Sequence, residues 1–283
     1  MNQTIQTTLL LGALTGLFLF VGNMIGGQQG MLVGFIFAAI MNFGTYFFSD
    51  KLVLAQYGAK EADRARYSHL YSLIENLARQ ANLPMPKVYV IDMPTPNAFA
   101  TGRDANHAVV AVSPSIMQAL TDEELTAVLA HELGHVKNGD MLVSTIAATI
   151  AGAISYLANM AMYFGPSMRS RDDDRGGNPL GLLFMVIVTP IAATLLHLAI
   201  SRSREFLADE YSGHLTRRPL ALANALRKIS GYAQRYPMEA DPGHNASAHL
   251  FIINPFDASL FAKLFSTHPP LHERIAKLEA MAR

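Results

Sequence analysis

The stretch that decides the fold is His131-Glu132-Leu133-Gly134-His135. Two histidines four positions apart lie on one face of an α-helix, one turn from each other, so both imidazoles can bind the same metal ion. Glu132 lies beside them, within reach of a water molecule on that ion. A zinc ion with three protein ligands keeps one position for water and lowers the pKa of that water to about 7. The stretch therefore predicts a catalytic zinc site in which the water is the nucleophile and Glu132 is the general base.

The residues just before this stretch, 125–130, are almost wholly apolar. Two histidines and a glutamate on such a helix need a reason, because burying polar groups without partners is costly. A pair of ordinary surface side chains is the alternative, and the apolar surroundings argue against it. Thr121 and Glu124 form a capping-box pattern, which predicts a helix that begins there and reaches about Lys137.

The third metal ligand must come from elsewhere in the chain. The chain has no cysteine, and residues 136–140 contain no histidine, so a distant glutamate is expected. Glu205 is the strongest candidate. Glu205 and Asp209 are again four apart, so one can bind the metal while the other accepts the ring N–H of a ligating histidine. The alternative is that Glu205 and Asp209 lie on an ordinary solvated helix face, beside Arg202 and Arg204.

Four apolar, uncharged stretches predict membrane-spanning helices: about 8–25, 30–49, 141–164 and 179–200. Each is near the ~20 residues needed to cross a hydrocarbon core of ~30 Å. The composition agrees, because charged residues make up 16% of the chain, against about 25% in a typical soluble domain. A cleaved signal peptide is the alternative for the first stretch, although no basic residue precedes it. A buried or interfacial hairpin is the alternative for the last two.

The remaining, charged parts of the chain predict an α+β fold, mainly α-helical, with a small β-sheet. We expect an amphipathic helix over 60–82, strands over 87–92 and 108–112, and an edge strand over 97–102. We also expect an amphipathic helix over 201–236, a loop over 237–253, and closing helices over 256–265 and 269–282. The predicted organisation is a transmembrane hairpin (1–50), a first catalytic part (51–140), a second hairpin (141–200) and a second catalytic part (201–283).

Basic residues beside the spans predict the orientation in the membrane. They follow the second span, precede the third and follow the fourth, whereas none lies before residue 8 or at 26–29. Two hairpins return the chain to the same side, so the catalytic parts and the C-terminus are expected to face the cytoplasm. The formal net charge is zero and no basic stripe is visible, which argues against a nucleic-acid partner.

Several motifs, taken together and in order, carry a resemblance that covers nearly the whole chain. They are the four spans, residues 97–102, the stretch 131–135 followed by Asn138-Gly139-Asp140, residues 204–209, and Thr267-His268-Pro269-Pro270. This set resembles the HtpX-like membrane zinc metalloproteases of the gluzincin type. It is similar, more loosely, to the eukaryotic membrane proteases that process prenylated proteins.

The resemblance implies roles for particular residues. It implies that one zinc ion per chain is bound by His131, His135 and Glu205, with Asp209 supporting a ligating histidine. It also implies that Asn97, Ala98 and Phe99 hold the substrate backbone on an edge strand. His268 would donate to the oxyanion, and Arg274 would orient substrate or support the site.

The resemblance further implies an endopeptidase of the bacterial cytoplasmic membrane that cleaves membrane or misfolded proteins, in quality control and stress response. Two other functions stay open. A membrane scaffold with a structural metal is one, and the presence of Glu132 argues against it, because a structural site needs no general base. A narrow processing protease for one substrate is the other.

Overall fold

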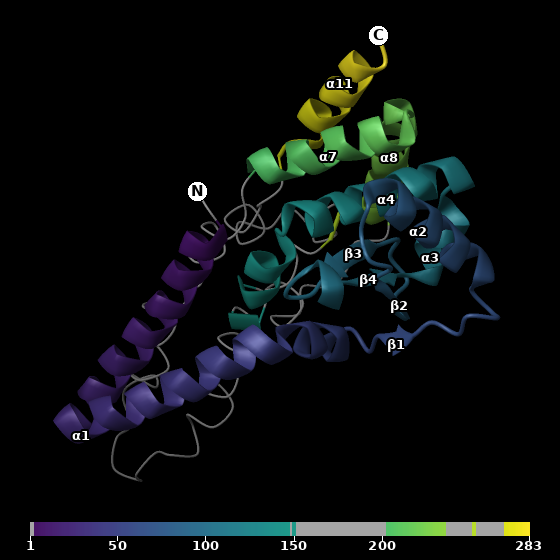
Figure 1. Ribbon diagram of the computed structural model, residues 1–283. Helices are drawn as coiled ribbons and strands as arrows, with labels where there is room; N and C mark the ends of the chain where they lie inside the picture. Colours follow the sequence, from purple (N-terminus) through teal and green to yellow (C-terminus); the bar gives the residue numbers. More distant parts are fainter. Residues whose placement is uncertain (1–2, 148, 151–201, 236–250, 253–268) are drawn as a thin grey trace, which may run out of the picture.

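The computed structural model describes residues 3–147, 149–150, 202–235, 251–252 and 269–283 (Figure 1). The first residues of the third predicted span, 141–147 and 149–150, are described and helical. The rest of that span, the fourth predicted span, most of the predicted loop at 237–253, the predicted helix at 256–265 and His268 lie outside the described residues. The described part is mainly helical with one small mixed sheet, as the sequence predicts. Of the four predicted spans, it contains two helices that are long and apolar enough to cross a membrane, Ile5–Asn23 and Gly26–Gln56.

These two helices form a hairpin within α1 (Gln3–Gln56), which is broken at Gly26 and Gly27. Gly27 has a φ of 56°, which costs little in a residue without a Cβ atom. Gly22 and Gly30 then face each other so closely that a Cβ atom on either would overlap the backbone oxygen of the other. Asn42 adds a polar tie between the two helices, since its Nδ2 donates to the hydroxyl of Thr15 over 2.8 Å.

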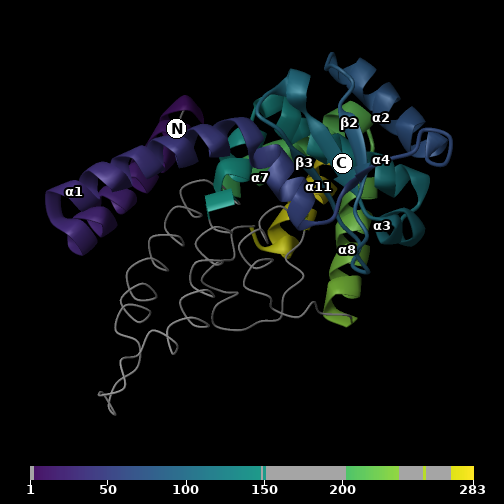
Figure 2. The ribbon, with the colours of Figure 1, turned by 90° about the horizontal axis from the view of Figure 1, so that it is seen from below.

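The hairpin projects away from the other described helices and the sheet (Figures 1 and 2). Its outward surface is apolar. Large exposed apolar side chains on its second helix include Leu32, Val33, Ile40 and Phe43, each more than 60% exposed. An uncovered apolar surface of this kind suits a lipid environment. The second helix is longer than the predicted span at 30–49 and continues to Gln56.

The sheet has four strands: β1 (Lys60–Glu61), β2 (Lys87–Val90), β3 (Ala98–Thr101) and β4 (Val109–Val112). Their order is β1-β2-β4-β3, with β2 and β4 parallel and the other two pairs antiparallel. The strand predicted at 97–102 is therefore an edge strand, as expected.

Alternate residues of the strands enter two different cores. Val88 and Val110 belong to a core that also contains residues of α2 (Ser68–Ala81) and α4 (Asp122–Asn138). Phe99 and Val109 point to the opposite face, where they meet Val53, Leu54 and Tyr57 at the end of α1. The second helix of the hairpin thus packs directly on the sheet.

The helix α4 is central, in contact with α2, with β3, with α7 (Arg202–Thr216) and with α8 (Pro219–Arg235) (Figure 1). The predicted capping box is present: Thr121 Oγ1 accepts from the Glu124 amide, and the Glu124 carboxylate accepts from the Thr121 amide. Glu124 also accepts from Lys228 Nζ of α8 over 2.7 Å. The helix ends at Gly139, which has a φ of 72°. Shorter elements complete this part: η1 (Ala105–His107) and α3 (Pro114–Ala119).

Two predicted helices differ from the structure. The helix predicted over 60–82 begins only at Ser68, because Lys60 and Glu61 pair with β2 instead. The helix predicted over 201–236 is two helices. Pro219 has no amide hydrogen and disfavours helical geometry in the residue before it, and Arg217 has a φ of 55°. The closing helix predicted over 269–282 is present as α11 (Leu271–Met281).

Candidate active site

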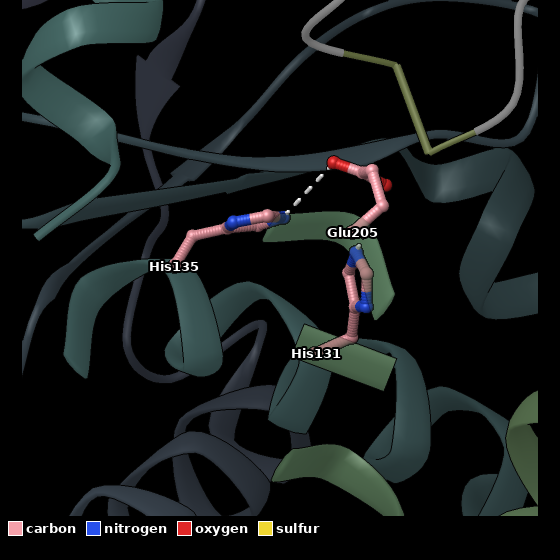
Figure 3. Close-up of side chains that lie close together, drawn as sticks. All are labelled: His131, His135 and Glu205. Atoms are coloured by element: carbon pink, nitrogen blue, oxygen red, sulfur yellow. Dashed lines mark ion pairs between the residues drawn. The ribbon is translucent and has the colours of Figure 1, made fainter. Parts of the chain in front are cut away.

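Three candidate metal ligands converge from two helices: His131 and His135 from α4, and Glu205 from α7 (Figure 3). One ligand atom from each lies within 4.8 Å of the others. The Glu205 carboxylate is 3.8 Å from His131 Nε2 and 3.5 Å from His135 Nε2. These distances are too long for good hydrogen bonds. They are close to the roughly 3.3 Å that separates two ligands of a tetrahedral zinc ion with bonds of about 2.0 Å. The donor set therefore fits one zinc ion.

A close approach of α4 and α7 brings Glu205 to the two histidines. A Cβ atom on Gly134 would lie 3.2 Å from Ala208 Cα and 3.2 Å from Tyr211 Cδ1. Glycine at this position lets the two helix backbones come together. Ser212 adds a buried tie, since its hydroxyl donates to the Ala127 carbonyl over 2.6 Å.

Behind His131 lies a buried carboxylate–guanidinium pair. Asp209 Oδ1 is 3.0 Å from His131 Nδ1. Arg274 of α11 donates to both Asp209 oxygens, each over 2.7 Å, and its Nη1 lies 3.3 Å from Glu205 Oε2. Arg274 is only 1% exposed and also donates to the carbonyl of Ile252. Of its two implied roles, this geometry favours support of the site over contact with substrate.

Burial favours the neutral form of His131. Burial lowers the pKa of His131 below its ordinary value. Burial alone would raise the pKa of Asp209, but the charge and hydrogen bonds of Arg274 outweigh it and hold that pKa below its ordinary value. An ionised Asp209 close to Nδ1 favours the neutral tautomer that carries its proton there, which leaves Nε2, the atom on the side of Glu205, free to bind a metal.

The side chain of Glu132 extends from α4 to the edge strand β3. Its Oε2 accepts from the Ala100 amide of β3 over 2.9 Å, and the residue is 4% exposed. Burial, with a smaller contribution from the charge of Glu205, raises the pKa of Glu132 to about 7 against the opposing charge of His135. The candidate general base is thus on the same helix as the two histidines, and its carboxylate is held at the edge of the sheet.

His135 has a second carboxylate–guanidinium pair behind it, which the sequence analysis did not identify. Asp140 Oδ2 is 3.6 Å from His135 Nδ1, and Asp140 Oδ1 is 3.1 Å from Arg204 Nε. Burial alone would lower the pKa of His135, but Asp140, Glu205 and Glu132 raise it to about 9. In the sequence, Asp140 and Arg204 stand out only as parts of motifs. Their separation along the chain gives no indication that they form a pair.

The side chains predicted to bind substrate are buried. Ala98 is fully buried, and Phe99 packs its ring 5.5 Å from that of Tyr57 at the end of α1. Asn97 is also fully buried, and its Oδ1 accepts from the Ile252 amide. Among the residues that the structure describes, Asn97 Nδ2 has no hydrogen-bond partner. His268 lies outside the described residues.

Comparisons with known proteins agree with one another. Residues 64–282 match the model of a family described as "Peptidase family M48". A "Protease HtpX homolog" from Thermodesulfovibrio yellowstonii is 54% identical over 284 residues, which cover 99% of each chain. Another, from Sulfurihydrogenibium sp., is 50% identical over 293 residues, covering 100% of this chain and 97% of the relative. The crystal structure of S. mikatae Ste24p shares the fold, with a TM-score of 0.52 at 19% identity, over 98% of this chain and 65% of that one.

Proposed function

The chain belongs to peptidase family M48 and is an HtpX-like metalloprotease, and from this premise we propose that it is a zinc-dependent endopeptidase of the bacterial cytoplasmic membrane. Its substrates on this proposal are membrane or misfolded proteins, cleaved in quality control and the stress response. The observation that carries the proposal is the convergence of His131, His135 and Glu205, with Glu132 beside them.

The proposed hydrolysis depends on the side-chain atoms that are free to bind a metal or a proton. A zinc ion bound by the two Nε2 atoms and the Glu205 carboxylate would polarise the scissile carbonyl and acidify a water molecule. Glu132 would accept a proton from the attacking water and pass it to the leaving amine nitrogen. The Ala100 amide holds the Glu132 carboxylate at the sheet edge during both transfers. Asp209 keeps the His131 ring in the orientation that ligation needs.

Substrate would bind along β3 in extended form, with its backbone beside residues 97–99. Two observations support this placement: β3 is at the edge of the sheet, and its Ala100 amide contacts the candidate base. We assign oxyanion stabilisation to His268, because it lies just before α11, the helix whose Arg274 contacts Glu205.

The membrane placement rests on the α1 hairpin. Its exposed apolar surface suits lipid, and the end of its second helix packs on the sheet, which keeps the active site near the membrane. We propose that residues 141–200 form a second hairpin, so that 51–140 and 201–283 are two parts of one cytoplasmic catalytic unit. Fusion of a reporter to the C-terminus tests the orientation, and a periplasmic signal would contradict it.

The activity is tested on full-length protein purified in detergent. Metal is removed, zinc is restored, and cleavage of casein is compared for the wild type, Glu132→Gln and a control, Glu210→Gln. Glu210 lies on α7 with a side chain that is 59% exposed. The proposal expects zinc-dependent cleavage by the wild type and the control, with loss of cleavage in Glu132→Gln. Equal cleavage by Glu132→Gln and the wild type would refute the assigned mechanism.

A further inference from the structure

The pair formed by Asp140 and Arg204 lies behind His135, outside the set of three ligands and the base. Asp140 directly follows the helix-ending Gly139, and its amide donates to the His135 carbonyl over 3.0 Å. The backbone thus fixes Asp140 relative to the residue whose ring it faces. Its carboxylate lies between His135 Nδ1, at 3.6 Å, and Arg204 Nε, at 3.1 Å. The side chains of Asp140 and Arg204 are only 7% and 13% exposed.

The arrangement repeats the one behind His131. In both, a carboxylate faces the Nδ1 atom of a histidine, and an arginine from another element holds the carboxylate. A carboxylate that faces Nδ1 favours the tautomer whose Nε2 is free to bind a metal. At 3.6 Å the Asp140 carboxylate is beyond hydrogen-bond distance, so it acts on the His135 ring through its charge. For His135 that Nε2 already faces Glu205 at 3.5 Å.

The position of the pair in the chain gives it a second consequence. Asp140 is the last residue before the predicted third span, and Arg204 lies in the first turn of α7, next to Glu205. Their contact therefore joins the two ends of the segment 141–201. It also fixes the beginning of α7, which carries Glu205, against the end of α4, which carries His135.

We propose that Asp140 and Arg204 are positioning residues for His135, and that they raise the affinity of the site for its metal. This inference rests on the proposed zinc site. The alternative is a purely structural ion pair that holds α7 on α4 and leaves metal affinity unchanged. The 3.6 Å separation from His135 is longer than the 3.0 Å between Asp209 and His131. The Asp140 contact is therefore weaker, and its loss should cost less affinity than the loss of Asp209.

The test uses full-length protein in detergent, freed of metal, with zinc affinity measured by competition with a chromophoric chelator. The variants are Asp140→Asn, Arg204→Gln, the double substitution, and Asp209→Asn for comparison. The matched control is Glu123→Gln, which removes an exposed pair between Glu123, at the beginning of α4, and Arg218, just before α8. The melting temperature of each metal-free variant reports its folding independently.

Loss of a carboxylate behind a ligating histidine typically weakens metal binding about 10–100-fold. We expect about 10-fold for Asp140→Asn, a larger loss for Asp209→Asn and no change for Glu123→Gln. The double substitution should bind zinc no more weakly than Asp140→Asn, since Arg204 acts through Asp140. The visible spectrum of the cobalt-substituted protein should shift in Asp140→Asn and stay unchanged in the control.

The outcomes separate this inference from the proposed function. Wild-type zinc affinity in Asp140→Asn, with or without a lower melting temperature, would overturn the positioning role and leave the zinc site intact. Additive losses in the double substitution would overturn the assignment of Arg204. Arg204→Lys keeps the charge in a milder change, and its affinity should exceed that of Arg204→Gln. A wild-type protein that binds no zinc would overturn both the inference and the proposed function.

Discussion

Arg274→Gln should destabilise the protein strongly, although Arg274 is neither a metal ligand nor the base. Its guanidinium makes two 2.7 Å hydrogen bonds to Asp209, one of 3.0 Å to the Ile252 carbonyl, and an ion pair with Glu205. Glutamine is uncharged and cannot replace this set. The substitution leaves the Asp209 carboxylate buried without its guanidinium partner.

The magnitude follows from the burial of the pair. The side chains of Arg274 and Asp209 are 1% and 4% exposed, so solvent screens their interaction little. Removing one partner of such a pair typically costs about 3–5 kcal/mol. For a chain of this size, 1 kcal/mol corresponds to a shift of about 2–4 °C in melting temperature. The expected loss is therefore on the order of 10 °C.

The assay is thermal unfolding of the metal-free protein in detergent, followed by circular dichroism. Arg227→Gln is the matched control, because it removes an ion pair between α8 and α11 whose side chains are 44% and 46% exposed. Exposed pairs contribute about 0–1 kcal/mol, so the control should melt within a few degrees of the wild type. Adding Asp209→Asn to Arg274→Gln should restore part of the loss. The reasoning is refuted if Arg274→Gln melts no lower than Arg227→Gln.

Three further predictions concern helix packing and capping. Gly134→Ala should weaken zinc binding several-fold, because the new methyl group pushes α7 and Glu205 away from α4. Gly231→Ala is the control, because position 231 has open space around it. Equal zinc affinity in the two variants would contradict the predicted role of Gly134. Glu124→Gln should lower stability at neutral pH. Burial alone would raise the pKa of Glu124, but its hydrogen bonds to Lys228 and Thr121 and the charge of Lys228 hold that pKa below its ordinary value. The difference in unfolding free energy between the wild type and Glu124→Gln, measured by urea titration, should therefore vanish as the pH falls through the folded-state pKa. Gly22→Val should splay the hairpin and lower the yield of folded membrane-inserted protein, whereas Gly16→Val, with nothing within 4 Å, should not; equal yields would count against the close helix contact.

The metal ligands on α4 could be predicted from sequence because they are local. A helix fixes the geometry of residues four apart, so His131 and His135, and likewise Glu205 and Asp209, were expected to act in pairs before any tertiary contact was known. The capping box at Thr121 fixed the beginning of α4 for the same reason.

What the sequence did not reveal depends on contacts between distant segments. The pairing of Asp140 with Arg204 exists only because α7 returns to the end of α4. Arg274 had two possible roles until α11 placed it against Asp209. The strand at Lys60 and Glu61 was mistaken for helix, because pairing with β2 overrides the local helical pattern. The end of α7 before Pro219 could have been predicted locally, since proline restricts the conformation of the residue before it. The helical periodicity of apolar residues on both sides of Pro219 favoured one continuous helix instead.

The central claim is that His131, His135 and Glu205 bind one zinc ion in a metalloprotease. The most direct measurement is the zinc content of full-length protein after equilibrium dialysis, for the wild type, Glu205→Ala and the exposed control Glu210→Ala. The account predicts one zinc ion per chain in the wild type and the control, and loss of bound zinc in Glu205→Ala. Unchanged stoichiometry and affinity in Glu205→Ala would contradict it.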